Sequence, residues 1–360
     1  MRELEHISRF CRRTTPWDNL LMIAEMEGVA GLLYFNLKSS GILNTLSRPF
    51  TEKLEKINSS IRERTSSIIE EAEAISKILK QAGIPVVALQ GLSLMTIYGD
   101  PCLRPLGDAD LMVKPVHRAS LRELLCAAGY QNPIETHPNI FLKNSICIDI
   151  HTHVLNLDRI RSRQYLFPAD LTSMWDRTKP LFDRSGDLLS LDPFDNFIAL
   201  TAHALKHGYS RLIWLVDLHE SLLKMCDNAN CYENIIERAR FWHQERIVIY
   251  ALILVEEIFG MRTPVWFKKE LGINRLNVLE KYLLLKKIRG RVQRELFNLL
   301  WLYNIKKIAN KIEFIKETAF PRDEISVRSF NDGYPNRVGF VYAKRLGKVI
   351  TKVGKVFSGS

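Results

Sequence analysis

The sequence predicts an α+β protein, in which a small mixed sheet flanked by helices is followed by a mainly helical C-terminal domain. Three observations predict this class. Helical apolar spacing fills the first part of the chain, short strand-like runs follow between residues 84 and 155, and helical spacing returns from Asp192 to about Thr318. The change from a 3.6-residue to a two-residue period marks the passage from helix to sheet. With 360 residues, 46% apolar and 25% charged, the chain has a globular composition and room for two domains.

The first 83 residues are predicted to be an N-terminal helical segment. From about Thr51 apolar residues recur at helical spacing, and Gly83 with Pro85 ends the pattern. The run from Pro85 to Gln90 then has the length of a buried strand, Gly91 interrupts it, and residues 92–98 return to a helical pattern. The predicted order is strand, turn, helix.

Two further strands complete the predicted core at 84–155. In residues 106–113, Leu111 and Val113 fall on one face, and Asp108 and Asp110 fall on the other. A helix over about 115–128, ended by Gly129, separates this strand from the next. In residues 146–154, one face is predicted to carry Ile146, Ile148, Ile150 and Val154, and the opposite face Cys147, Asp149, His151 and His153.

The remaining chain divides into a helical domain, 156–320, and a tail, 321–360. Asp192 as N-cap, Pro193 in the first turn and a closing Gly208 predict the first long helix of that domain. Residues 333–360 hold six Lys or Arg and no acidic residue. Their apolar stripe fits a basic helix lying on an anionic membrane or on a partner, and a solvated terminus fits equally well.

Composition favours an anionic partner. The net charge is +11 and the pI is about 9.3, which suits nucleotides, nucleic acid or acidic lipid without choosing among them. Six cysteines lack the spacing of a zinc site or a disulfide framework, although Cys226 and Cys231 are close neighbours. With no apolar stretch at the N-terminus to serve as a signal peptide, a cytoplasmic location is expected, with the tail offering peripheral contact to the inner face of the membrane.

Three aspartates carry the predicted chemistry. Asp108 and Asp110 project the same way from one strand, roughly 7 Å apart at their α-carbons, so both reach one small space. Asp149 lies centrally on the polar face of a later strand and can complete the site. Such a set suits two Mg²⁺ or Mn²⁺ ions, because these ions prefer oxygen ligands and a two-metal site needs bridging carboxylates.

The turn at Gly91 and Ser93 is the predicted triphosphate contact, because backbone N–H groups at a helix start attract anions. Arg104 can contact phosphate, or it can tie Asp100 or Asp108 in place. His151 shares the face of Asp149 and can orient a ligand or touch substrate. His203 and His207 lie four apart on one helical face, where they can touch the acceptor or pack the helical domain, with Asp217 as a candidate partner; Trp175 and Trp214 are expected in the core.

These segments together resemble the uncharacterised bacterial nucleotidyltransferase family of the polymerase-beta-like nucleotidyltransferase superfamily. The resemblance covers roughly residues 70–225. It is carried by Leu89–Tyr98, Asp100-Pro101, Arg104-Pro105, Gly107–Val113, Gly129-Tyr130, Ile148–His151, Leu200–His207 and Trp214–Asp217. The family usually has Lys where this chain has Gln90, and the superfamily prefers Gly or Ser where it has Leu92.

The resemblance implies transfer of a nucleoside monophosphate from a nucleoside triphosphate to an acceptor hydroxyl, with release of pyrophosphate. Asp108, Asp110 and Asp149 would hold two magnesium ions, with Gly91 and Ser93 near the triphosphate. A small molecule, a glycan or lipid precursor, a protein and an RNA end all remain open as acceptor. Two rival hypotheses also stay open: a metal-dependent phosphohydrolase that uses the Asp and His set, and a non-catalytic adaptor anchored to the membrane by its tail.

Overall fold

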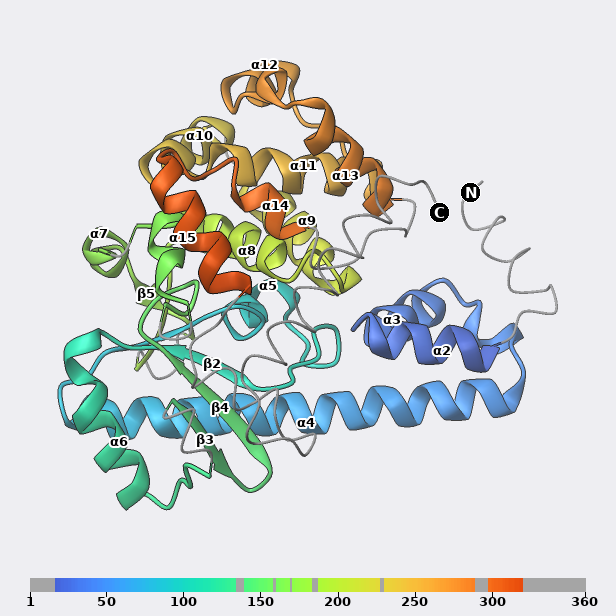
Figure 1. The fold of residues 1–360 in the computed structure, drawn as a ribbon. Coiled ribbons are helices and arrows are strands. Elements are labelled where there is room, and N and C mark those ends of the chain that lie inside the picture. Colours follow the sequence, from blue (N-terminus) through green and yellow to red (C-terminus); the bar gives the residue numbers. More distant parts are fainter. Residues whose placement is uncertain are drawn as a thin grey trace, which may run out of the picture.

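A mixed six-stranded sheet lies between two groups of helices (Figure 1). The computed structural model describes residues 17–133, 139–157, 160–168, 170–182, 187–226, 230–288 and 297–319. Within these ranges the fold is α+β with a helical C-terminal part, as the sequence predicts. The basic tail, 321–360, falls outside the described residues.

The N-terminal part is helical, and one helix in it is very long. It consists of α2 (Trp17–Met26), α3 (Ala30–Ser39), the 3-10 turn η1 (Leu43–Thr45) and α4 (Arg48–Gln81). The 34 residues of α4 span about 50 Å at 1.5 Å per residue. Its first half packs on α2 and α3 through Phe50 and Leu54, and its second half packs on the sheet. The predicted helix from Thr51 is therefore confirmed, and it begins three residues earlier.

The sheet region alternates short strands with short helices. Its elements are β1 (Val86–Ala88), η2 (Leu92–Leu94), α5 (Met95–Tyr98), β2 (Ala109–Met112), η3 (Pro115–His117), α6 (Arg118–Ala127), β3 (Ile140–Lys143), β4 (Ile146–His151), η4 (Arg161–Tyr165), α7 (Thr172–Asp176), β5 (Lys179–Pro180) and β6 (Leu188–Ser190). The strand order is β3-β4-β2-β1-β6-β5. β2 runs parallel to β4, β1 runs parallel to β6, and the other neighbours are antiparallel.

The C-terminal part contains eight described α-helices and the turn η5 (Ile273–Arg275). The helices are α8 (Pro193–Lys206), α9 (Leu212–Met225), α10 (Cys231–Phe241), α11 (Glu245–Phe259), α12 (Val265–Glu270), α13 (Val278–Ile288), α14 (Asn298–Trp301) and α15 (Ile308–Ala319). The side chain of Asp192 accepts a hydrogen bond from the N–H of Phe194, which confirms the predicted N-cap of α8. None of the described helices is both long and apolar enough to cross a membrane.

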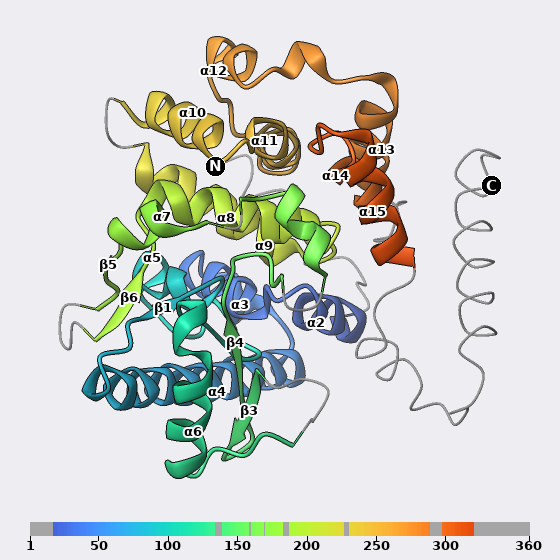
Figure 2. The same ribbon diagram turned by 60° about the vertical axis from the view of Figure 1, so that its left-hand side comes forward.

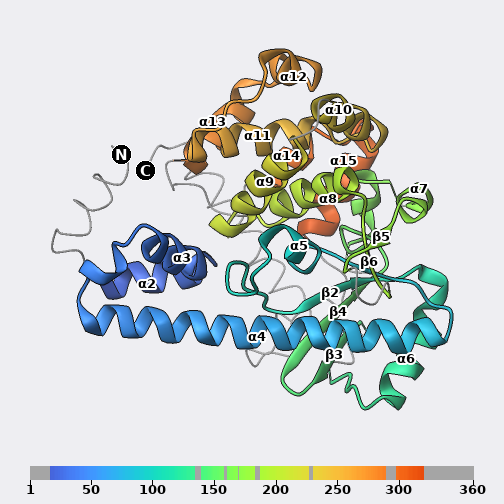
Figure 3. The same cartoon turned by 180° about the vertical axis from the view of Figure 1, so that it is seen from behind.

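Each face of the sheet is covered by its own set of helices. Ala109 and Leu111 pack against α4 and α6 in one core, whereas Met112 packs toward α8 and α9 in the other. Figure 2 shows α4 and α6 on one side of the strands and α8 on the other, and the view from behind in Figure 3 shows the same layers. Asp110, which shares the face of Met112, therefore points toward the helical part.

A two-residue turn sets the register of the β3–β4 hairpin. Lys143 pairs with Ile146, and the connecting Asn144 and Ser145 have φ values of 49° and 64°. Positive φ at both central residues is the geometry that matches the right-handed twist of the strands. Because side chains alternate along a strand, this turn fixes which residues of β4 face the helical part.

Three features differ from the sequence-based expectation. The sheet takes β5 and β6 from the range assigned to the helical domain, and β3 was not predicted. β4 ends at His151, so Val154 joins the core on the α8 side instead of the Ile146 face, and His153 contacts backbone atoms of Leu155 and Pro168. Cys226 and Cys231 form a disulfide between α9 and α10, which the cysteine spacing did not predict.

Candidate active site

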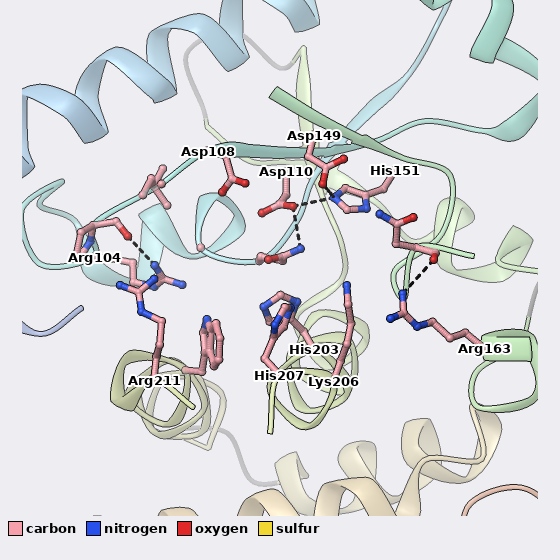
Figure 4. A pocket seen from close by; sticks show the side chains of 17 residues that line it. Arg104, Asp108, Asp110, Asp149, His151, Arg163, His203, Lys206, His207 and Arg211 are labelled. Carbon is pink, nitrogen blue, oxygen red and sulfur yellow. Dashed lines mark hydrogen bonds and ion pairs between the residues drawn. The ribbon is translucent and has the colours of Figure 1, made fainter. Parts of the chain in front are cut away.

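The sheet register places two of the predicted aspartates side by side. β2 and β4 are neighbouring parallel strands, and Asp110 is the direct partner of Asp149 across them. Both side chains project toward α8 because the alternate positions on each strand are buried against α4. Asp108 comes just before β2, on the same face as Asp110 (Figure 4). The three predicted carboxylates thus border one cavity.

Asp110, Asp149 and His151 form a group that can hold a cation. One ligand atom from each lies within 4.8 Å of the others. His151 Nε2 is 2.7 Å from Asp110 Oδ1 and 3.8 Å from Asp149 Oδ2. Two carboxylates and one imidazole suit a divalent metal, and Asp108 adds a third carboxylate beside them. The donor set therefore fits the predicted metal chemistry.

Asp108 shows how strongly negative charge is concentrated here. Burial, together with the nearby charges of Asp110 and Asp149, raises the pKa of its carboxyl to about 7, against a partial opposing effect of His151 and Arg104. Like charges this close disfavour simultaneous ionisation. A bound divalent cation would remove that repulsion and favour the ionised form of all three groups.

The turn after β1 reaches the carboxylates through Gln90. This residue has a φ of 53°, and its Nε2 donates to Asp110 Oδ1 at 2.9 Å. Gly91 borders the cavity, and a Cβ there would lie 2.8 Å from Arg104 and Leu106 atoms, so only glycine fits without displacement. Ser93 is buried behind the turn, where its Oγ donates to the carbonyl of Gln90 and contacts Asn196 Oδ1.

Arg104 is held by a residue far along the chain. Its Nε and Nη2 donate to the two oxygens of Asp217 at 2.7 and 2.8 Å, and both side chains are buried. Tyr98 donates to the same carboxylate. Arg104 therefore pairs with Asp217, and not with Asp100 or Asp108 as the sequence analysis suggested. Asp100 pairs with Arg62 instead, and Asp217 pairs with Arg104 instead of a histidine. This pair ties α9 to the segment before β2.

The opposite wall of the cavity is aromatic. His203 of α8 and His207, which directly follows α8, have ring centroids 4.6 Å apart, and Trp214 of α9 contacts both rings. Burial lowers the pKa of His203 well below its usual value, and the charges of His207 and Lys206 lower it further. His203 is therefore neutral near pH 7. Trp175 is buried in the core as predicted, whereas Trp214 is half-buried and lines the cavity.

The cavity has a volume of about 400 Å³ and separates acidic from basic side chains. Asp108, Asp110 and Asp149 lie on the sheet side, and Lys206 and Arg211 lie on the helical side, with Arg163 at one end (Figure 4). Acids opposite bases suit a ligand that brings both metal cations and phosphate anions.

Sequence reasoning missed several of these lining residues. Gln90 was noted only as a departure from a family pattern, and Arg163, Lys206 and Arg211 were not singled out. Lys206 could have been found, because it lies between His203 and His207 on a helix already assigned to the site. Arg211 had no local signal, since its place depends on contacts with the N-terminal helices described below.

A mixed sheet with clustered carboxylates facing a basic helical wall is typical of metal-dependent enzymes that transfer phosphorus-containing groups. The chain belongs to the uncharacterised nucleotidyltransferase family, whose model matches residues 13–260. That range includes the sheet, the three aspartates and helices α8 and α9. The protein is accordingly a nucleotidyltransferase, in the class of transferases of phosphorus-containing groups. No curated protein and no solved structure matches the chain.

Proposed function

We propose that the protein binds a nucleoside triphosphate with two Mg²⁺ or Mn²⁺ ions and transfers its nucleoside monophosphate to an acceptor hydroxyl. The observation that carries this proposal is the side-by-side placement of Asp110 and Asp149 on parallel strands, with Asp108 next to them, across one cavity from basic residues. Divalent ions held there would neutralise the phosphates and lower the pKa of the acceptor hydroxyl.

The reaction is a substitution at the α-phosphorus. The acceptor oxygen forms a bond to that phosphorus in line with the departing group, and the bond to the β-phosphate oxygen breaks, so that pyrophosphate leaves. Asp108 and Asp110 would hold the ions, and Asp149 would help take the proton from the acceptor hydroxyl. Holding the reactants in this geometry supplies much of the rate enhancement expected of such enzymes.

In this proposal, some of the residues assigned to the nucleotide contact it directly and others support the turn that does. Gly91 lets the backbone approach the triphosphate closely. Ser93 and Arg104 support the same turn from behind, through the carbonyl of Gln90 and the carboxylate of Asp217. His151 orients the carboxylates, and His203 and His207 form the face presented to the acceptor or the base.

The geometry favours this reaction over hydrolysis by a joint Asp and His metal centre. Among the described residues, the group able to bind a metal contains Asp110, Asp149 and His151, while the rings of His203 and His207 contact Trp214 of α9. The hydrolytic centre of that alternative would need six side chains to converge: Asp108, Asp110, Asp149, His151, His203 and His207. The membrane-anchored adaptor depends on the tail, which lies outside the described residues.

The test is incubation with each α-labelled nucleoside triphosphate and Mg²⁺ or Mn²⁺, with measurement of label transfer and pyrophosphate release. Asp110→Asn and Asp149→Asn should each lower turnover at least about 100-fold. Asp176→Asn is the matched control, because it makes the same charge change at an exposed position and should leave turnover unchanged.

Two results would overturn the proposal. Release of orthophosphate without a labelled product would indicate a phosphohydrolase. Absence of turnover with all triphosphates, together with absence of nucleotide binding in calorimetry, would indicate an adaptor.

A further inference from the structure

Arg211 differs from Arg104, the buried arginine of the cavity, in what surrounds its charge. Arg104 is neutralised by Asp217 through two hydrogen bonds. Around Arg211, no carboxylate of the described residues lies within salt-bridge distance, although the side chain is half-buried. Burial lowers the pKa of Arg211 below its usual value and the neighbouring charge of Arg104 lowers it further, while the more distant charges of Glu27, Asp217 and Asp108 oppose this in part. A half-buried cation without a paired anion is costly unless a ligand supplies one.

The turn between α2 and α3 holds Arg211 in place. Arg211 Nε donates to the carbonyl of Met26 at 3.1 Å. Gly28 lies against the guanidinium so closely that a Cβ on this glycine would be 2.8 Å from Arg211 Nη2. The guanidinium therefore contacts the backbone of the α2–α3 turn on one side and lines the cavity on the other.

The same turn also occupies the first N–H groups of α9. Glu27 accepts a hydrogen bond from the N–H of Leu212 through its side chain and one from the N–H of Ile213 through its carbonyl. The start of α9 is therefore capped from within the protein, and its N–H groups are not offered to a ligand. Charge for an anion at this end of the cavity must come from side chains, and Arg211 is the side chain placed there (Figure 4).

The opposite side of the cavity defines which anion fits. Arg211 lies toward Asp108, and the charge of Asp108 acts on it. The α-phosphate of the substrate must sit at the carboxylates, where the metals would be. The phosphates beyond it can then extend toward Arg211, whose planar fork matches two phosphate oxygens.

We propose that Arg211 binds the terminal phosphates of the nucleoside triphosphate, and that the α2–α3 turn, through Met26 and Gly28, is part of the active site because it positions this arginine. The inference rests on the proposed function. Under this inference, the triphosphate is bound from the helical side of the cavity by Arg211 as well as by the turn at Gly91.

The first experiment measures binding of inorganic tripolyphosphate with Mg²⁺ by calorimetry, beside a nucleoside triphosphate and the matching monophosphate. Arg211→Met should weaken tripolyphosphate and triphosphate binding roughly 10- to 100-fold, the range expected for loss of a charge-assisted hydrogen bond. Binding of the monophosphate should change about threefold or less, because it lacks the terminal phosphates. Arg211→Lys should fall between, since it keeps the charge and loses the fork.

The second experiment tests the turn with two matched glycines. Gly28 and Gly41 have φ values of 74° and 72°, but a Cβ on Gly41 would meet nothing within 4 Å. Gly28→Ala should displace the guanidinium and weaken tripolyphosphate binding several-fold, and Gly41→Ala should share the backbone strain without weakening binding.

Equal binding of tripolyphosphate by Arg211→Met and the wild type would overturn the inference, as would equal loss of monophosphate and triphosphate binding. Failure of the proposed function is distinguishable: the wild type would then bind tripolyphosphate through Arg211 and still transfer no nucleotide.

Discussion

Two neighbouring side chains, Gln90 and His151, contact the carboxylate of Asp110. One of its oxygens accepts from Gln90 Nε2 and also lies 2.7 Å from His151 Nε2. A cation at this oxygen would compete with both neighbours. Under the proposed function, Gln90 would therefore influence both the metal ions, through Asp110, and the turn that approaches the triphosphate.

Asp108 should make stability depend on pH when no metal is bound. Its folded-state pKa of about 7 lies above the ordinary 3.8, so the folded protein holds this proton more tightly than the unfolded chain does. The resulting stabilisation is complete below pH 4 and is lost as the pH rises to about 7. In the Asp108→Asn variant this side chain cannot ionise. The free energy of unfolding of the variant should therefore exceed that of the wild type by about 1–3 kcal/mol at pH 8, with a much smaller difference at pH 5.

Urea denaturation in the presence of a chelator at the two pH values measures this difference. Addition of Mg²⁺ at pH 8 should narrow the gap, because the metal stabilises the wild type in proportion to its binding. An equal difference at pH 5 and pH 8 would show that Asp108 is not the titrating group.

At the scale of elements, the turn from β1 into η2 depends on the absence of a side chain at position 91. Arg104 is fixed by Asp217 and has little freedom to retreat from a new Cβ. Gly91→Ala should therefore lower the free energy of unfolding by about 1–3 kcal/mol, the usual cost of overpacking. Gly107→Ala is the comparison, because a Cβ there would meet nothing within 4 Å. Chemical denaturation of both variants measures their free energies of unfolding. An equal loss of stability in Gly91→Ala and Gly107→Ala would contradict the prediction.

The sequence predicts those features that depend on residues close together in the chain. The helix from Thr51, the Asp192 cap and the shared face of Asp108 and Asp110 each depend on residues within a few positions of one another. The Arg104–Asp217 pair joins residues 113 positions apart, and β6 pairs with β1 across about a hundred residues. Patterns in a single sequence carry no record of such contacts, so the acidic side of the cavity was predictable and most of the basic side was not.

At the scale of the whole molecule, the basic tail adds a prediction that is independent of the site. Residues 333–360 carry six Lys or Arg and no acid. The full chain should bind vesicles containing acidic lipid, since each basic residue near such a surface contributes about 1 kcal/mol. Removal of 333–360 should abolish this binding and leave the thermal stability of the remaining chain unchanged. Sedimentation with acidic and with neutral vesicles measures it, and equal binding by the shortened protein would refute it.

The hairpin turn at Asn144 and Ser145 affects the active site although neither residue lines the cavity. It determines the phase of β4, and hence whether Asp149 or its neighbours Ile148 and Ile150 face the cavity. A substitution scan scored by activity should therefore show intolerance at this solvent-facing turn, as though it held catalytic groups. Conversely, a stiffer turn at the same two positions offers protein engineers a way to secure the active site without altering any residue that touches substrate.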